Sequence, residues 1–167
     1  MPLFDEVLDL VAHRVPLIVE LKDQHDSAHN KRLCELVDAS LQRYGGLTSV
    51  QSFNPIQMKI FTDIPGAKER YLTGQLGCVI DSEILPSPVL RLAVAQFIGT
   101  ALGRSHYLAG KSGDFEKSLG SIAMKIWPKT PRVMWTIRSE EEYEKYRSEG
   151  ADCVIFEGFI PNVEKTM

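Results

Sequence analysis

The feature that most constrains the fold is a regular alternation between short apolar segments and amphipathic helical segments. Short apolar runs such as residues 17–21 and 133–137 are typical of strands that are covered on both faces. Between such runs, apolar residues recur at helical spacing, as they do over residues 28–44. Strands that alternate with helices in this way indicate a parallel sheet.

We expect an N-terminal helix over residues 3–11, followed by strands and helices in turn. The strands are expected over residues 17–21, 47–52, 71–76, 107–109, 133–137 and 153–156. The helices between them are expected over residues 28–44, 54–64, 88–102, 114–127 and 140–148. Asn54 and Pro55 start a helix, Gly45 ends one, and Ser139 with Glu142 forms a capping box. Gly74 weakens the strand that contains it.

Two architectures satisfy this order of elements, a doubly wound open sheet and a (β/α) barrel. A closed barrel needs eight strands and usually about 250 residues, more than this chain of 167 residues supplies. A dinucleotide-binding sheet has little support, because no Gly-rich loop follows the first strand. We therefore expect a single α/β domain over residues 1–167, an incomplete TIM (β/α)8 barrel with about six of eight βα units and parallel strands. An unrelated α/β sheet remains the alternative.

Charge and composition limit the possible binding partners and the cellular compartment of the protein. The formal net charge is -3 and basic residues are scattered, which argues against a nucleic-acid partner. The longest apolar run, over residues 90–102, is too short and too polar to span a membrane. Cys34, Cys78 and Cys153 are far apart and odd in number, so we expect buried thiols in a reducing, cytoplasmic compartment and no disulfide or zinc site.

Candidate functional residues stand where the expected strands end, since barrel enzymes use that edge. Successive side chains of a strand point to opposite faces, so Glu20 and Lys22 are expected on the same side. They are either a metal-binding carboxylate beside a phosphate-binding amine or a structural ion pair.

Further candidates follow the other strands, each with a plainer alternative. Ser52 is either an anion donor or part of a helix start, and Phe53 and Trp135 are either pocket walls or core residues. Glu157 is a site acid or a solvated loop residue.

Five segments, in order and spacing, carry a resemblance to a known family: VPLIVELK, SVQSFNP, GQL, MWTIRSEEEY and ADCVIFEGFIP. Together with the opening PLFDEVLDLV, they resemble the glycerophosphodiester phosphodiesterase family, a phosphoric diester hydrolase family of lipid and glycerol metabolism. The resemblance implies a TIM barrel that hydrolyses glycerophosphodiesters to glycerol 3-phosphate and an alcohol, with a divalent metal.

The resemblance also implies roles for individual residues. Glu20 would be a ligand of Mg²⁺ or Ca²⁺, hard cations that carboxylates suit. Lys22 would approach the phosphate, and Phe53 and Trp135 would flank the glycerol. These roles rest on analogy with the family.

The chain departs from the family in the groups that perform catalysis. The family's His-Arg-Gly, Glu-x-Asp and His-Asp motifs, which supply the catalytic histidines and other metal acids, are absent from the sequence. His13 does not replace them, because it ends a helix before the Glu20 strand, and His25 and His29 are expected to be solvated loop residues.

We therefore assign no catalytic residue and expect a truncated, inactive form of a metal-dependent phosphodiesterase. Metal binding by this chain itself is not expected to be strong. The alternative is a non-catalytic barrel remnant that binds a phosphorylated polyol or a partner chain. Open sheet edges on residues 17–21 and 153–156 also predict self-association.

Overall fold

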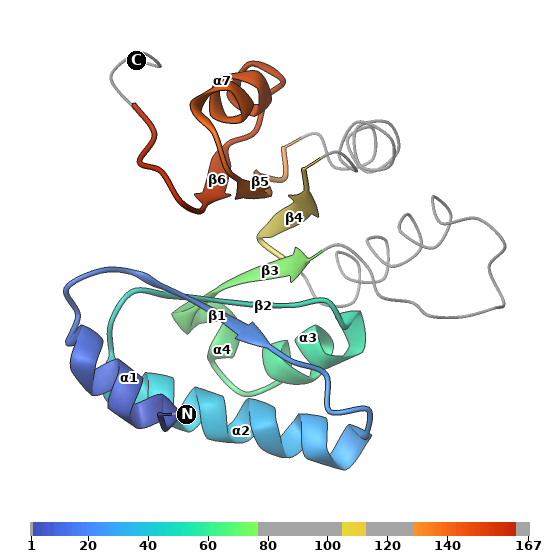
Figure 1. Ribbon diagram of the computed structural model, residues 1–167. Coiled ribbons are helices and arrows are strands. Elements are labelled where there is room, and N and C mark those ends of the chain that lie inside the picture. The colour runs from blue at the N-terminus through green and yellow to red at the C-terminus, as the bar shows by residue number, and fades with distance from the viewer. Residues whose placement is uncertain (1, 77–104, 113–128, 163–167) are drawn as a thin grey trace, which may run out of the picture.

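The computed structural model describes residues 2–76, 105–112 and 129–162 (Figure 1). The strands in these ranges are β1 (Leu17–Leu21), β2 (Thr48–Ser52), β3 (Leu72–Leu76), β4 (Tyr107–Lys111), β5 (Arg132–Ile137) and β6 (Cys153–Phe156). The helices are α1 (Phe4–Val11), α2 (Ser27–Tyr44), α3 (Pro55–Thr62), α4 (Ala67–Arg70) and α7 (Glu140–Ser148). The helices expected over residues 88–102 and 114–127 lie outside the described residues.

The strands form one six-stranded sheet in the sequential order β1-β2-β3-β4-β5-β6. All five neighbouring pairs are parallel. A doubly wound sheet would reverse its strand order partway, and this sheet does not. The sheet twists continuously from β1 to β6 and curls as an incomplete barrel (Figure 1). The predicted architecture, with about six parallel βα units, is confirmed.

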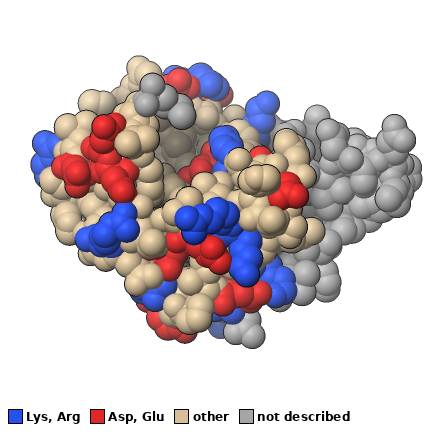
Figure 2. All heavy atoms as spheres, turned by 90° about the horizontal axis from the view of Figure 1, so that it is seen from below, with Lys and Arg blue, Asp and Glu red and all other residues tan. Residues whose placement is uncertain are grey.

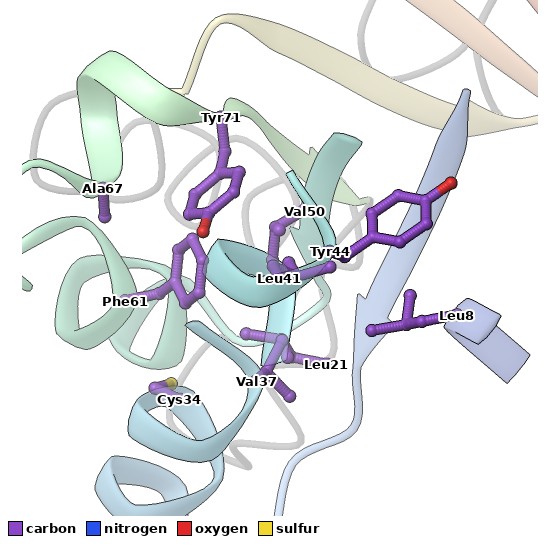
Figure 3. Packing of buried hydrophobic residues seen from close by; sticks show 10 residues of the cluster. All are labelled: Leu8, Leu21, Cys34, Val37, Leu41, Tyr44, Val50, Phe61, Ala67 and Tyr71. Carbon is purple, nitrogen blue, oxygen red and sulfur yellow. The ribbon is translucent and has the colours of Figure 1, made fainter. Parts of the chain in front are cut away.

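Helices cover the outer face of the sheet and form its main core there. In Figure 1, α1, α2, α3 and α4 lie on one side of β1 to β3. Figure 3 shows their apolar side chains packed against Leu21 of β1 and Val50 of β2, with Phe61 of α3 and Leu41 of α2 at the centre. A smaller outer cluster joins α7 to β4 and β5, through Leu108, Met134, Ile137, Tyr143 and Tyr146.

The inner face carries a separate cluster formed by the alternate residues of the strands. Leu76, Tyr107, Ala109 and Val133 are buried there, and Phe53, Trp135 and Ile155 pack against them. Since successive strand residues point to opposite faces, this division decides which polar side chains reach the barrel interior. The rest of the inner face is more open, and Ile18 and Leu72 are exposed on it.

Gly74 leaves space on β3 for an aromatic ring. The ring of Tyr107, which lies on β4, passes over β3 at this position. A Cβ atom on Gly74 would lie 2.2 Å from the ring of Tyr107 on β4. The Tyr107 hydroxyl forms hydrogen bonds with Ser49 Oγ at 2.7 Å and Gln51 Oε1 at 2.9 Å, both on β2. Burial raises the pKa of Tyr107. The glycine that weakens the strand signal in the sequence thus lets one side chain bridge β4 to β2.

The helix ends follow the predicted signals with one correction. The Asn54 side chain accepts hydrogen bonds from the first turn of α3, with Pro55 at its start, and Gly45 ends α2 with a left-handed φ of 66°. Ser139 caps α7 by accepting from the Glu142 amide at 3.2 Å. The Glu142 carboxylate, however, accepts from the Arg138 amide and not from that of Ser139, so the predicted capping box is displaced by one residue.

The cysteines differ in environment. Cys34 is buried against α3, where burial raises the pKa of its thiol to about 12. The prediction of a buried thiol is wrong for Cys153, which is exposed. Cys153 begins β6, whose one partner in the described sheet is β5, so neighbouring strands cover it from one side only. Cys78 lies outside the described residues.

Candidate functional site

Glu20 and Lys22 lie side by side at the carboxyl end of β1, as alternation predicts. Lys22 Nζ is 2.5 Å from Glu20 Oε1. The Lys22 side chain is 74% exposed and that of Glu20 is 28% exposed. An ion pair this accessible contributes little to stability, about 0–1 kcal/mol. The ammonium group therefore remains available to a ligand that approaches the carboxyl edge.

An aromatic pair continues the site from Lys22 across the inner face. Lys22 Nζ lies 5.9 Å from the centroid of the Phe53 ring. The Phe53 ring meets the ring of Trp135 edge to face, with centroids 5.7 Å apart. The structure thus brings Glu20, Lys22, Phe53 and Trp135 into one continuous series of contacts. Phe53 comes just after β2 and Trp135 lies in β5, so three separate strands contribute to this series.

The indole of Trp135 carries an unused hydrogen-bond donor. Its Nε1 atom is buried and has no hydrogen-bond partner among the described residues. A buried polar group without a partner costs about 1–3 kcal/mol, and such groups in native proteins call for an explanation. The donor lies in the same side chain that contacts Phe53, so it belongs to the candidate site.

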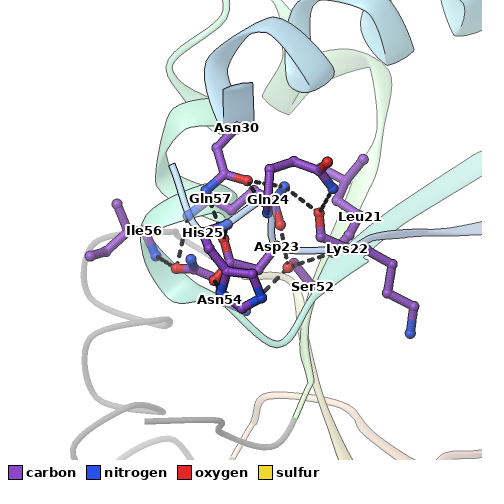
Figure 4. A network of polar contacts seen from close by, with 10 residues as sticks. All are labelled: Leu21, Lys22, Asp23, Gln24, His25, Asn30, Ser52, Asn54, Ile56 and Gln57. Atoms are coloured by element: carbon purple, nitrogen blue, oxygen red, sulfur yellow. Dashed lines mark hydrogen bonds and ion pairs between the residues drawn. The ribbon is translucent and has the colours of Figure 1, made fainter. Parts of the chain in front are cut away.

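A buried polar network holds the loop that carries Lys22 (Figure 4). Gln57 of α3 donates through Nε2 to Asn30 Oδ1 at 2.9 Å and to the Lys22 carbonyl at 3.2 Å. Asn30 Oδ1 also accepts from the Gln24 amide at 3.0 Å. Asn30 and Gln57 are both buried. The backbone from Lys22 to Gln24 is therefore held by two side chains, Gln57 of α3 at Lys22 and Asn30 of α2 at Gln24.

Ser52 belongs to this network, away from the inner face. Its hydroxyl is fully buried, 2.8 Å from the Leu21 carbonyl oxygen and 2.7 Å from Gln57 Oε1. It also accepts from the Asn54 amide at 3.1 Å. Of the two roles that the sequence allows for Ser52, anion donor or structural residue, these contacts favour the structural one. Its hydroxyl links the end of β1 to the end of β2.

Other candidates at this edge are solvated. Glu157 follows β6 and pairs with Arg138 at 2.9 Å, with both side chains 66% exposed. His25 is exposed near Asp23, and His29 is exposed and 2.8 Å from Asp26. His29 lies in the first turn of α2, not in the preceding loop as predicted.

His13 lies on the helical side of the molecule. Its amide donates to the Tyr44 hydroxyl at 3.1 Å, and its ring centroid is 4.5 Å from that of Tyr44. It lines a groove of about 460 Å³ between α1 and α2, beside the Asp5–Arg43 ion pair. Acidic and basic side chains are interspersed on the face seen in Figure 2. The described contacts of His13 are thus with Tyr44 of α2 and not with Glu20 or Lys22.

A complete metal centre does not fit the residues that the structure describes. Within residues 2–76, 105–112 and 129–162, no three His, Cys, Asp or Glu side chains converge to hold an ion. Glu20 is one carboxylate at the edge, and its Oε1 already faces Lys22. Divalent cations of this kind take about six or more oxygen ligands, so Glu20 would need donors from elsewhere.

Three polar residues near the candidate site were not predicted from the sequence. Asn30 and Gln57 lie in the middle of helical patterns and Tyr107 in a weak strand, where nothing distinguishes them from ordinary surface or core residues. Their partners are 27 and 56 residues away in the chain, which no local pattern can show.

Fold and site together define a parallel βα sheet of the barrel class, with its polar and aromatic groups at the carboxyl edge. No family model and no curated protein sequence matches the chain. Solved structures do match, and the three described below carry the names of phosphodiesterases, two of them for glycerophosphodiesters.

The structure of such an enzyme from Silicibacter pomeroyi has a TM-score of 0.66 and 19% identity over 91% of this chain and 52% of its own. The Parabacteroides distasonis enzyme has a TM-score of 0.67 and 17% identity over 93% of this chain and 59% of its own. An Oleispira antarctica phosphodiesterase, solved with the product sn-glycerol-3-phosphate, has a TM-score of 0.64 and 15% identity over 93% and 57%.

These matches confirm the predicted resemblance at the level of the fold. The chain spans between half and three-fifths of the length of these three proteins. The likeness to these proteins is therefore one of fold.

Proposed function

We propose that this chain is part of a glycerophosphodiester phosphodiesterase and that it binds the glycerol phosphate portion of the substrate at the carboxyl edge of its sheet. The observation that carries the proposal is the series of contacts from Glu20 through Lys22 and Phe53 to Trp135. It lies at the edge where barrel enzymes place their sites, in a fold shared with phosphodiesterases.

Each residue has a role that its chemistry suits. The exposed Lys22 ammonium would donate to phosphate oxygens, where charge-assisted hydrogen bonds are strong. The Phe53 and Trp135 rings would form apolar walls for the carbon side of the glycerol. Glu20 orients Lys22 and would supply one carboxylate ligand to a Mg²⁺ or Ca²⁺ ion, whose other ligands would have to come from groups outside the described residues.

We further propose that hydrolysis requires groups beyond these 167 residues and that this chain alone is inactive. The absence of the family's histidine and Glu-x-Asp motifs supports this. In the described ranges His25 and His29 are exposed at the start of α2, and His13 is on the helical side. None of these residues contacts the Glu20–Trp135 series within the described structure.

A second candidate is a non-catalytic barrel remnant that binds a phosphorylated polyol or a partner chain. It is favoured by the lack of a converging metal-ligand group among the described residues. Both candidates share the binding site and differ in chemistry, so binding and hydrolysis must be measured separately.

Hydrolysis is tested with glycerophosphocholine, the purified chain, and Mg²⁺ or Ca²⁺. Release of glycerol 3-phosphate should not exceed that of a protein-free control. Metal-dependent turnover that Glu20→Gln abolishes would contradict the proposed inactivity.

Binding is tested by calorimetry with sn-glycerol 3-phosphate. Lys22→Gln should weaken binding by about tenfold or more, the loss expected for one charge-assisted hydrogen bond. Lys31→Gln is a matched control, because Lys31 is 70% exposed and lies on α2. Equal binding by the two variants would contradict the role of Lys22.

We also propose a cytoplasmic location, supported by the buried free thiol of Cys34. Among the described residues, no helix has the length and apolar character needed to cross a membrane.

A further inference from the structure

Lys111, the last residue of β4, places a second lysine side chain at the carboxyl edge of the inner face. Tyr107 and Ala109 of β4 belong to the inner cluster, while Leu108 packs on the outer side with α7. Since alternate strand residues share a face, Lys111 lies on the inner side with Tyr107 and Ala109. It is exposed there.

The register of the sheet puts Lys111 directly beside the aromatic pair. Lys111 and Trp135 are Cα partners in the β4–β5 ladder. The Ser112 amide donates to the Trp135 carbonyl at 2.7 Å, so the two strands stay paired up to this point. Trp135 in turn contacts Phe53, and Phe53 contacts Lys22. Two lysines from β4 and the end of β1 therefore flank one aromatic pair.

Among the described residues at this edge, the ion pairs leave the positive charge of Lys111 uncompensated. Lys22 pairs with Glu20 at 2.5 Å, and Arg138 pairs with Glu157 at 2.9 Å. Within the described part of the chain, the Lys111 side chain has neither an ion pair nor a hydrogen bond. Next to it, Trp135 Nε1 is a buried donor with no hydrogen-bond partner among the described residues. An anion would accept from both of these donors.

We propose that Lys111 is a second ammonium group of the anion site, and that it binds the same phosphate group as Lys22. This inference rests on the proposed function and adds a residue to it. The ligand class is a phosphate monoester or diester whose oxygens reach both lysines, with the aromatic pair beneath them. The Trp135 indole N–H is the additional donor that ligand binding would satisfy.

Binding of inorganic phosphate and of sn-glycerol 3-phosphate, measured by calorimetry, tests this proposal. Lys111→Gln should weaken the binding of both ligands by about tenfold. Lys111→Arg keeps the charge and should restore affinity to within about threefold of the original. Lys31→Gln is again the control, because it removes an equally charged side chain from α2.

A second readout does not depend on any Lys111 variant. In a phosphate titration of the unmodified chain, the indole N–H resonance of Trp135, assigned with Trp135→Phe, should shift in a saturable way. The Trp135 resonance should also shift less in Lys111→Gln at the same phosphate concentration.

The outcomes separate the two proposals. Loss of binding in Lys22→Gln with unchanged binding in Lys111→Gln would overturn this inference and leave the proposed function standing. No saturable binding of either ligand by the unmodified chain would overturn both. An indole resonance that does not move while phosphate binds would also overturn the inference, because it would put the anion elsewhere.

Discussion

The ring of Phe53 meets the ring of Trp135 edge to face, at a centroid distance of 5.7 Å and an interplanar angle of 87°. Two strands, β3 and β4, lie between β2 and β5, which carry these residues at or near their ends. In a flat sheet β2 and β5 would be about 14 Å apart, because neighbouring strands are spaced by about 4.8 Å. The contact is made because the sheet curls and both side chains are long.

This contact should stabilise the curled sheet measurably. We expect Phe53→Ala and Trp135→Ala each to lower the free energy of unfolding by about 1–3 kcal/mol, since both rings are half-buried. A double-mutant cycle in urea should give a coupling of about 0.5–1.5 kcal/mol for an edge-to-face pair. A cycle of Phe53→Ala with Tyr143→Ala, whose side chain packs in the outer cluster, should be additive. Additivity of the Phe53–Trp135 pair would contradict the structure.

Gly74→Ala should destabilise the sheet because its Cβ would meet the Tyr107 ring. The ring would have to move, and its hydrogen bonds to Ser49 and Gln51 would be lost or distorted. Two hydrogen bonds contribute about 1 kcal/mol each, and overpacking adds about 1–3 kcal/mol. Chemical unfolding measures the change.

Tyr107→Phe is the companion variant to Gly74→Ala, since it removes the hydrogen bonds and leaves the packing. It should cost less than Gly74→Ala. Similar stability of Gly74→Ala and the unmodified chain would mean that Tyr107 does not cross β3 at that position.

Asp23 should titrate below its usual value of 3.8, chiefly because Asn30 donates a hydrogen bond to its carboxylate. Its pKa is lower in the folded chain than in the unfolded chain. The stabilisation is therefore present above the unfolded pKa and is lost as the pH falls through the folded pKa. Asn30→Ala should raise the Asp23 pKa, measured from carboxyl carbon shifts by NMR. An unchanged value would show that Asn30 is not the main cause.

The open edges should make the chain self-associate. In the described sheet β1 pairs with β2 alone and β6 with β5 alone, so each has one unpaired side. Ile18 of β1 is 52% exposed and Phe156 of β6 is 45% exposed. Exposed apolar edge strands favour association. We expect concentration-dependent oligomers by light scattering.

A charge on the edge strand should oppose this association. Ile18→Lys should reduce the oligomer fraction, and Leu36→Lys, at a residue 49% exposed on α2, should not. A monomer at all concentrations would contradict the prediction.

Much of the fold was predictable because it depends on short-range signals. The runs around Val19 and Met134 are apolar enough to predict strands, and each is followed by a helix with its own capping residue. The prediction that both faces are covered is wrong for β1, because Ile18 is 52% exposed on the inner face. Alternation alone placed Glu20 and Lys22 on one side of β1, where the structure has them. The predicted and observed helix boundaries differ by one or two residues where the helix end depends on local hydrogen bonds. One example is α3, which is expected to end at residue 64 and ends at Thr62.

Other features depend on contacts between distant segments. The sequence does not show that Cys153 is exposed, because this depends on its strand lying at a sheet edge. It also does not indicate α4, whose four residues are too few for a helical pattern. The buried pair of Asn30 and Gln57 is polar in sequence, and only the meeting of α2 and α3 makes it internal.

By itself, the sequence determined the order of strands and helices, their parallel arrangement and the charged residues at the carboxyl ends. These follow from apolar periodicity and alternation, which act over a few residues. Only the tertiary structure decided that Phe53 meets Trp135, that Tyr107 crosses Gly74, and that Lys111 lies beside Trp135. Such relationships depend on the register and curl of the sheet, which are set by the packing of all its strands together.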